Sequence, residues 1–498
     1  MMKSFLSKRV QRILDLIGLL EVQNGAVDTS VLYRDYDYQP ASLTVDINLA
    51  NSYFDRLLKI EKGDRVEITY KGAATYEDAY AFAMSQDTLC QLLEKVFFHP
   101  YYAVADMARL LFVSPSTIYR WIDFFNEAVE GAFDIHLTTH PLVMRGDEAE
   151  VRTFYMSFFK ERYPFSDWPF PYIAKEEIDD FLNQVLPMKY GKHFYRYYQC
   201  FHLQIAISLQ RFCQGFHLTE DLLSQNKRVR TLAQDILDRG RTLHYHSSDP
   251  GKILTPSSKL YAELLAPFVG DRDAETYPKL VQLAEEDPVA NRIFIYINKV
   301  SSRLCRDFGI HLDNERDLIL AIYNALVGTF GRSLSRPIFY SPYLIYEKKI
   351  QTRYPRVCLK IRDIIRTYNE VFSLPTDETF VAYIFYVICT TWENFINQLT
   401  QNQKPVRILV LSKFSLFHAM ALRDQILFYF GNQVEVTVLR ETPVMMEEMD
   451  LSSYDLLVSN FRLTKASLPT ILCESIYTYK DYDHLARAIF NLRLANPT

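Results

Sequence analysis

Apolar residues recur at helical spacing near the amino terminus and predict a helix with one buried face over residues 3–21. Asn24-Gly25 ends that helix. A second short helix is expected over residues 29–36, and Pro40 suits the first turn of a third. An alternating strand follows at residues 65–70. Three helices and then a small β-element are the order of a winged helix-turn-helix module.

The same order recurs with clearer signals in the next part of the chain. Residues 86–98 carry leucines along one side of a predicted helix. Residues 104–122 then read as two helices joined by a turn, because Ser114 is a good N-cap and Pro115 suits the first helical turn. Residues 133–144 supply a predicted β-hairpin wing. A plain helical hairpin in an all-α protein would explain one such pattern, but two tandem copies favour DNA-binding modules.

The helix that starts near Ser114 has a predicted outer face. Ile118, Ile122 and Phe125 fall at i, i+4 and i+7, so they are expected to pack inward. Residues on the opposite side near the helix start are those that reach bases and phosphates in a helix-turn-helix. The candidate DNA-binding residues are Ser42 and Thr44 in the first module and Ser114, Ser116, Thr117, Tyr119 and Arg120 in the second.

Residues 168–403 follow a helical pattern almost throughout, with proline and glycine at intervals. Two halves resemble each other, one with residues 202–211 inside an aromatic-rich helix and one with residues 315–332. A duplicated helical bundle is the economical interpretation.

The pattern changes again near residue 403. Residues 406–411 form a continuous apolar run that is typical of a buried strand. A helix over 419–430 and strands at 434–439 and 455–459 follow. Alternating strands and helices predict a small domain with a parallel sheet.

The expected fold is therefore mostly α and multidomain, with a small α/β domain at the carboxyl end. The predicted domains are two winged helix-turn-helix domains at 1–80 and 81–160, two helical regulatory domains at 161–285 and 286–402, and an α/β domain at 403–498.

Composition limits what the 498-residue chain can be. No apolar run approaches the length of a membrane helix, no signal peptide is apparent, and the seven cysteines are scattered without a CxxC pair. We therefore expect a cytoplasmic protein with no membrane partner, metal or cofactor.

The formal charge of −5 means that any nucleic-acid contact must come from local basic groups. No catalytic motif is recognised, so no catalytic residue is assigned and an enzyme is not expected.

Residues 86–161 resemble the DNA-binding core of the Mga family of virulence and carbohydrate regulators of Gram-positive bacteria. The residues that carry the resemblance are Ala105 to Ile122, Gly146-Asp147-Glu148, Arg152, Phe154-Tyr155 and Lys160-Glu161. The resemblance implies a transcription regulator, most simply an activator, that binds double-stranded promoter DNA. It also implies regulatory domains of the phosphotransferase-system type, a carboxy-terminal domain similar to a IIB component, and self-association as a dimer or higher oligomer.

Phosphorylation by a phosphocarrier protein of that system is part of what the resemblance implies. His202 lies near the expected phosphoacceptor position in the first regulatory domain, with Arg211 downstream. The second regulatory domain has Asn324 and Phe385 where acceptors would stand, and neither can form phosphohistidine. Ser412 replaces the phosphorylated cysteine of a true IIB component, and a hydroxyl is a poorer nucleophile than a thiol.

Two other classes of function remain open at this level. Similar duplicated regulatory domains occur on RNA-binding antiterminators, although those use a small β-rich domain rather than two helix-turn-helix modules. A non-catalytic interaction protein of the phosphotransferase system is the other alternative.

Overall fold

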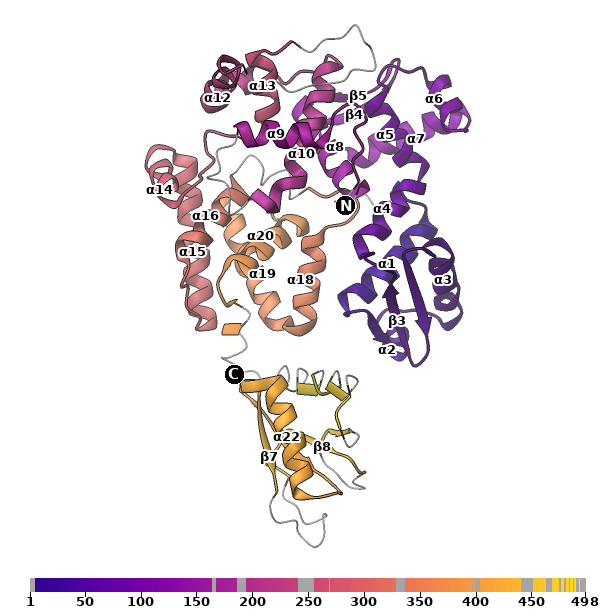
Figure 1. The fold of residues 1–498 in the computed structure, drawn as a ribbon, viewed down its shortest axis with the longest axis vertical. Helices are drawn as coiled ribbons and strands as arrows, with labels where there is room; N and C mark the ends of the chain where they lie inside the picture. The colour runs from indigo at the N-terminus through magenta and orange to yellow at the C-terminus, as the bar shows by residue number, and fades with distance from the viewer. Residues whose placement is uncertain are drawn as a thin grey trace. The chain divides into compact units, whose positions relative to one another are not determined.

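The computed structural model describes two compact units, and each is considered by itself (Figure 1). Unit 1 comprises Met1–Val300, Arg316–Thr352 and Cys358–Thr391, and unit 2 comprises Ser301–Glu315, Arg353–Val357 and Trp392–Thr498. The residues described are 5–163, 167–185, 194–240, 255–267, 269–327, 336–395, 397–398, 404–439, 451–462, 468–473, 476–478, 481–482, 484–486, 488–489 and 492.

The first module has the predicted three helices and wing. Its elements are α1 (Lys8–Val22), β1 (Ala26–Asp28), α2 (Thr29–Asp35), α3 (Pro40–Tyr53), β2 (Leu58–Lys62) and β3 (Arg65–Tyr70). The first helix begins later than expected because Ser7 caps it, its hydroxyl accepting from the Val10 amide at 3.3 Å. The predicted strand is β3, which pairs antiparallel with both β1 and β2.

The second module repeats this order and continues into a long helix. Its elements are α4 (Tyr76–Gln86), α5 (Thr88–Phe98), α6 (Val104–Leu110), α7 (Pro115–Val129), β4 (Ile135–Thr139), β5 (Leu142–Gly146) and α8 (Glu148–Arg162). The antiparallel pair β4–β5 is the predicted wing. The inward positions Ile118, Ile122 and Phe125 are all buried, as their spacing predicts.

Helices α3 and α7 match position by position. Each has proline in its first turn, Pro40 and Pro115. Three, seven, ten and fourteen residues after that proline, a buried apolar side chain packs inward. These side chains are Leu43, Ile47, Ala50 and Phe54 in the first module and Ile118, Ile122, Phe125 and Val129 in the second. The shared spacing shows that one local packing scheme is used twice.

The turn before each of these helices also matches. Three residues ahead of each proline the backbone enters the left-handed region, at Asp37 with φ 54° and at Phe112 with φ 57°. Aspartate tolerates this conformation better than phenylalanine does. The sequence signal for this turn is weak in the first module, because Asp37 and not a glycine stands at the left-handed position.

An asparagine clamps the wing to the helix in both modules. Asn51 of α3 exchanges two hydrogen bonds with the backbone of Ile60 in β2, at 2.8 and 2.6 Å. Asn126 of α7 does the same with Leu137 in β4, at 3.0 and 2.7 Å. Both asparagines stand eleven residues after the proline. Each wing is thereby held in a set register against its helix.

The remainder of the first unit is helical, as predicted. The elements that follow along the chain are α9 (Lys175–Val185), α10 (Phe194–Cys213), α11 (Glu220–Gln225), α12 (Lys227–Asp238), α13 (Ser258–Leu265), α14 (Tyr277–Glu286), α15 (Pro288–Phe308), α16 (Glu315–Leu326), α18 (Pro342–Arg353), α19 (Pro355–Phe372) and α20 (Glu378–Thr391). The end of α15, the first residue of α16, the last residue of α18 and the start of α19 fall in the second unit. The division of this region into two regulatory domains stays a prediction.

The carboxy-terminal part holds the predicted parallel sheet. Its elements are β6 (Val406–Leu411), α22 (Leu416–Phe430), a short 3₁₀ turn (Gly431–Gln433), β7 (Val434–Val438), β8 (Leu456–Ser459) and β9 (Thr470–Leu472). The strand order is β7-β6-β8-β9, and all neighbours are parallel. The apolar face of β6 packs against α22 through a core that includes Ile408, Val410 and Leu422. The expected fold class, mostly α with a small α/β domain, is confirmed.

The asparagine clamp leads to a testable prediction. Substituting Asn126→Ala leaves the Leu137 amide and carbonyl without their side-chain partners, so we expect the second module to lose about 2 kcal/mol of stability. Hydrogen exchange of the full-length protein should show faster exchange at Leu137. Glu127→Ala, an exposed neighbour on α7, is the control and should leave the wing unchanged. Equal protection of the wing in Asn126→Ala and the wild-type protein would contradict the clamp.

Candidate nucleic-acid interface

The amino-terminal end of α7 presents a cluster of hydroxyl groups. The Ser114 hydroxyl caps the helix, accepting from the Thr117 amide at 3.2 Å. It also lies 2.8 Å from the Ser116 and Thr117 hydroxyls. Ser114 and Ser116 are exposed and Thr117 is half-buried. Such hydroxyls and the positive end of the helix dipole can bind the phosphate backbone of DNA.

One turn further along, α7 exposes an uncompensated positive charge. Arg120 and Tyr119 are both exposed. Within the described residues, Arg120 forms no hydrogen bond or ion pair. By contrast, Arg109 on α6 is paired with Asp106. A free guanidinium on this helix is suited to bidentate contacts with guanine or with phosphate.

The wing of the second module exposes two basic side chains that the sequence did not single out. His136 and Arg145 are opposite each other in the β4–β5 ladder, and both are exposed. The hairpin turns at the cis bond between His140 and Pro141. The alternation of buried Ile135 and Leu137 with exposed His136 was the signal that could have marked this outer face.

In the first module the two candidate hydroxyls are engaged within the protein. The Ser42 hydroxyl donates to Gln39 O at 3.0 Å, and that of Thr44 donates to Pro40 O at 2.9 Å. Lys62, at the end of β2, donates to the Thr44 hydroxyl at 2.7 Å. Thr44 therefore joins the wing to the start of α3. The exposed side chain of Val45, on the same helix, was not among the expected contacts.

The modules are not basic as a whole. Residues 1–80 contain ten Lys and Arg against twelve Asp and Glu, and residues 81–160 contain six against ten. A general electrostatic attraction to DNA is therefore weak. Binding must depend on a few placed groups, as the charge of the chain predicts.

Helix α8 ties the second module to the helical region through buried charges. Glu148 accepts from Arg152 Nε at 2.9 Å and from Arg211 of α10 at 3.0 and 2.6 Å. Arg152 also donates to Glu263 of α13 at 2.6 Å. We call these four residues the α8 charge network. All four are buried, and two cations face two anions.

The α8 charge network extends to the surface on one side. His217 Nδ1 lies 3.0 Å from the second oxygen of Glu263. The Arg211 guanidinium lies 3.7 Å from the centre of the Phe216 ring, and that ring stacks on exposed Tyr101. Tyr101 lies in the loop that precedes α6. The α8 charge network is therefore connected to the helix-turn-helix through α8 itself and also through this loop.

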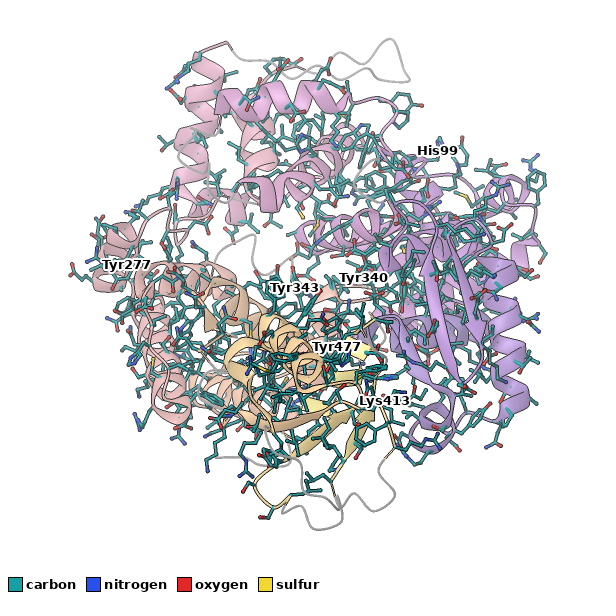
Figure 2. All side chains as sticks on the ribbon, turned by 60° about the horizontal axis from the view of Figure 1, so that its bottom comes forward. His99, Tyr277, Tyr340, Tyr343, Lys413 and Tyr477 are labelled. Carbon is teal, nitrogen blue, oxygen red and sulfur yellow. The ribbon has the colours of Figure 1, made fainter. Side chains whose placement is uncertain are left out.

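The far end of α8 contacts the segment that precedes α18. Glu161 accepts from the backbone amides of Ile338 and Phe339 at 2.7 Å and of Tyr340 at 3.3 Å. Burial raises the pKa of Glu161 to about 7, although the three amides oppose this rise. Tyr340, labelled in Figure 2, packs on Tyr80 of α4 with ring centroids 4.9 Å apart. The helical region thus contacts both ends of α8.

His202, the phosphorylation candidate, lies on α10 and is fully buried. Its Nε2 is 2.8 Å from the Asp179 carboxylate of α9. Nine residues further along the same helix is Arg211, which holds Glu148 of the α8 charge network. Transfer of a phosphoryl group to His202 would require the ring to leave this position.

The other candidate phosphorylation regions contain no histidine acceptor, as the sequence showed. The Asn324 side chain exchanges hydrogen bonds with the Ala274 backbone at 3.2 and 2.8 Å, and Phe385 is fully buried. In the second unit, the Ser412 hydroxyl lies 2.8 Å from His418 Nδ1 at the start of α22.

No group of three or more metal-binding side chains occurs among the residues with assigned positions. In that same part of the chain, no helix is long and apolar enough to cross a membrane.

Comparisons with known proteins agree with this geometry. Residues 73–159 match the Mga helix-turn-helix domain. The chain is 22% identical over 482 residues to a putative trans-acting regulator of Streptococcus pneumoniae, covering 92% of this chain and 93% of that protein. It is 22% identical over 496 residues to the capsule synthesis positive regulator AcpB of Bacillus anthracis, covering 96% and 97% of the two chains. A third relative, the anthrax toxin expression trans-acting positive regulator of the same species, is 21% identical over 409 residues and 78% of each chain. The resemblance to Mga-family regulators is confirmed.

The α8 charge network makes a strong prediction about stability. Glu148→Gln removes the anion that faces two buried guanidinium groups, and we expect a loss of about 3–5 kcal/mol in the free energy of unfolding. Glu150→Gln is the matched control on the same helix, because its partly exposed pair with Arg336 should contribute less than about 1 kcal/mol. Urea unfolding of the full-length variants measures both. Similar small losses in the two variants would show that the network is not a main support of the fold.

Proposed function

We propose that this chain is a transcription regulator that binds promoter DNA through both winged helix-turn-helix modules and activates the genes it controls. The observation that carries the proposal is the exposed outer face of α7, where Arg120 has no partner within the described residues. The match of residues 73–159 to the Mga helix-turn-helix domain supports it, and so do two relatives that are named as positive regulators. The proposed function is regulatory rather than enzymatic.

The proposed contacts follow from the geometry of the second module. Helix α7 enters a major groove, with Ser116, Tyr119 and Arg120 facing the bases and the Ser114 hydroxyl near a phosphate. The wing residues His136 and Arg145 contact the backbone beside it. In the first module, α3 with Ser42 and Thr44 occupies a neighbouring groove. Shape and deformability of the DNA add to specificity, because few charged groups are available for direct contact.

In this proposal, the helical region controls DNA binding. We assign His202 as the phosphoacceptor for a phosphocarrier protein of the phosphotransferase system. Its position on α10, the helix that also carries Arg211, supports an effect on the second module. A phosphoryl group adds charge in a buried site and would shift α10 relative to α8.

Self-association is the last part of the proposal. Helix α22 exposes large apolar side chains, among them Phe417 and Phe428 with exposed fractions of 80% and 84%. Exposed apolar surface of this kind is common at protein interfaces. A dimer held through this helix would place two sets of modules on one promoter, as in other dimeric helix-turn-helix proteins.

The DNA-binding part is tested by comparing two arginine variants. Arg120→Ala should weaken binding to promoter-length duplexes by roughly 5- to 150-fold, which corresponds to about 1–3 kcal/mol for one specific contact. Arg109→Ala is the control, since Asp106 already neutralises that charge, and it should bind like the wild-type protein. Fluorescence anisotropy at two salt concentrations measures the affinity, and circular dichroism checks the fold. If the wild-type protein prefers RNA or binds neither nucleic acid at moderate salt, the proposal is wrong.

The phosphorylation part is tested with the phosphocarrier system itself. The wild-type chain should take up one acid-labile phosphoryl group, and His202→Ala should take up none. His136→Ala is the control, because His136 is exposed on the wing and should not affect labelling. Retained labelling in His202→Ala, or none in the wild-type protein, would remove His202 from the mechanism.

A further inference from the structure

Two aromatic residues of the second module have a left-handed backbone. Tyr101, in the loop before α6, has φ 76°, and Phe112, in the turn between α6 and α7, has φ 57°. Glycines aside, the other residues of positive φ in the described part of the chain are small and polar, namely Asn24, Asp37, Ser373 and Asn394. A bulky aromatic residue is strained in this conformation, and such strain persists only where some contact compensates for it.

The contacts that compensate for the strain at Tyr101 lie within the protein. Its backbone amide donates to the Leu142 carbonyl oxygen of the wing at 3.2 Å. Its ring stacks on Phe216, with the ring centroids 5.8 Å apart. Packing inside the first unit therefore accounts for the backbone conformation of Tyr101.

Phe112 has no such compensation. Its ring contacts no other aromatic ring among the described residues, and its exposed fraction of 95% is the highest of any large apolar side chain there. The turn itself does not require phenylalanine, because Asp37 forms the matching turn of the first module with φ 54°. Phe112 thus combines backbone strain with an aromatic ring in water, and the fold uses neither.

Phe112 stands at the entrance to α7. It precedes by two residues Ser114, whose hydroxyl caps α7, so their Cα atoms are at most about 7 Å apart. In the proposed function the Ser114 hydroxyl lies near a phosphate and α7 enters a major groove. The exposed ring is then within reach of the same edge of that groove.

The chemistry of the ring limits what it can contact there. A phenylalanine ring has no hydrogen-bond donor or acceptor, so it cannot pair with a phosphate oxygen or with a polar base edge. In the major groove the apolar group that distinguishes one base from another is the 5-methyl group of thymine. Packing the ring on that methyl group removes apolar surface of both partners from water.

We propose that Phe112 is a specificity-determining residue that packs on the 5-methyl group of a thymine at the groove edge beside Ser114. This inference rests on the proposed function, because it requires α7 to enter a major groove. It adds a preference for thymine at the position that faces the turn. The first module lacks this preference, because Asp37 stands in the matching position.

Loss of the thymine methyl groups tests the contact from the side of the DNA. Promoter-length duplexes are prepared with thymine or with deoxyuridine in place of every thymine, so that the two differ only in the 5-methyl groups. Fluorescence anisotropy measures the affinity of the full-length protein for each. We expect the wild-type protein to bind the deoxyuridine duplex at least about fourfold more weakly, since burial of one methyl group contributes about that factor.

Phe112→Asn tests the contact from the side of the protein, because asparagine tolerates the left-handed backbone and lacks the ring. It should bind the thymine duplex roughly tenfold more weakly than the wild-type protein. On the deoxyuridine duplex the loss should be only about two- to threefold, because the methyl group that the ring covers is already absent. Its melting temperature should not fall, since the exposed ring does not support the fold. Phe112→Tyr keeps the ring and is the control, with the wild-type ratio between the two duplexes.

Several outcomes would overturn the assignment. The same fold-loss on both duplexes, or none on either, would show that Phe112 does not contact a thymine methyl group. A lower melting temperature of Phe112→Asn would show that the ring has a structural role instead. Normal DNA binding with lost activation of transcription would show that the ring contacts a protein. A wild-type protein that binds neither duplex contradicts the proposed function itself, whereas binding without the thymine effect removes only the role of Phe112.

Discussion

Two buried arginines and two buried glutamates hold the second DNA-binding module against the helical region. Taking such charges out of water is unfavourable unless each meets an opposite charge in good geometry. Glu148 and Arg152 come from α8, Arg211 from α10 and Glu263 from α13, so the three helices can be arranged in few ways that satisfy all four. The module is consequently fixed to the region behind it rather than tethered by a flexible linker.

This constraint matters for an acidic chain that carries a helix-turn-helix domain. Because the modules lack a general positive charge, the DNA affinity that we propose depends on the placement of a few groups such as Arg120 and the hydroxyls at the start of α7. Placement is sensitive to small rotations of the module, and α8 follows directly after the wing strand β5. A change in α10 that disturbs Arg211 would therefore reach the wing through Glu148.

The helical region contacts the two modules in different ways. It meets the second module through buried ion pairs and through Glu161, whose carboxylate accepts from three consecutive backbone amides. It contacts the first module through the partly exposed ion pair of Lys349 with Glu21. A cavity lies beside this contact, between α1 and α18. The first contact is made by buried side chains, whereas the second surrounds a cavity of about 560 Å³. The two modules are thus joined to the helical region by different kinds of contact.

The sequence by itself determined the local structure of both modules and of the parallel sheet. Pro40 and Pro115, followed by apolar residues at repeated offsets, specify two similar helices, since the period of burial is a property of neighbouring residues. The apolar run of β6 likewise specifies a strand that is buried on both faces. The asparagine clamps were also present as a repeated spacing, although only the structure shows what Asn51 and Asn126 bind.

Tertiary structure alone decided which distant residues meet. Arg152 and Glu263 are 111 positions apart, and no periodicity along the chain relates them. The same holds for the burial of His202 against Asp179 and for the cavity between α1 and α18. Hydrophobic patterns report which face of an element is buried, but they do not say which element covers it. Partner choice follows from shape and charge complementarity between surfaces that exist only after the chain has folded.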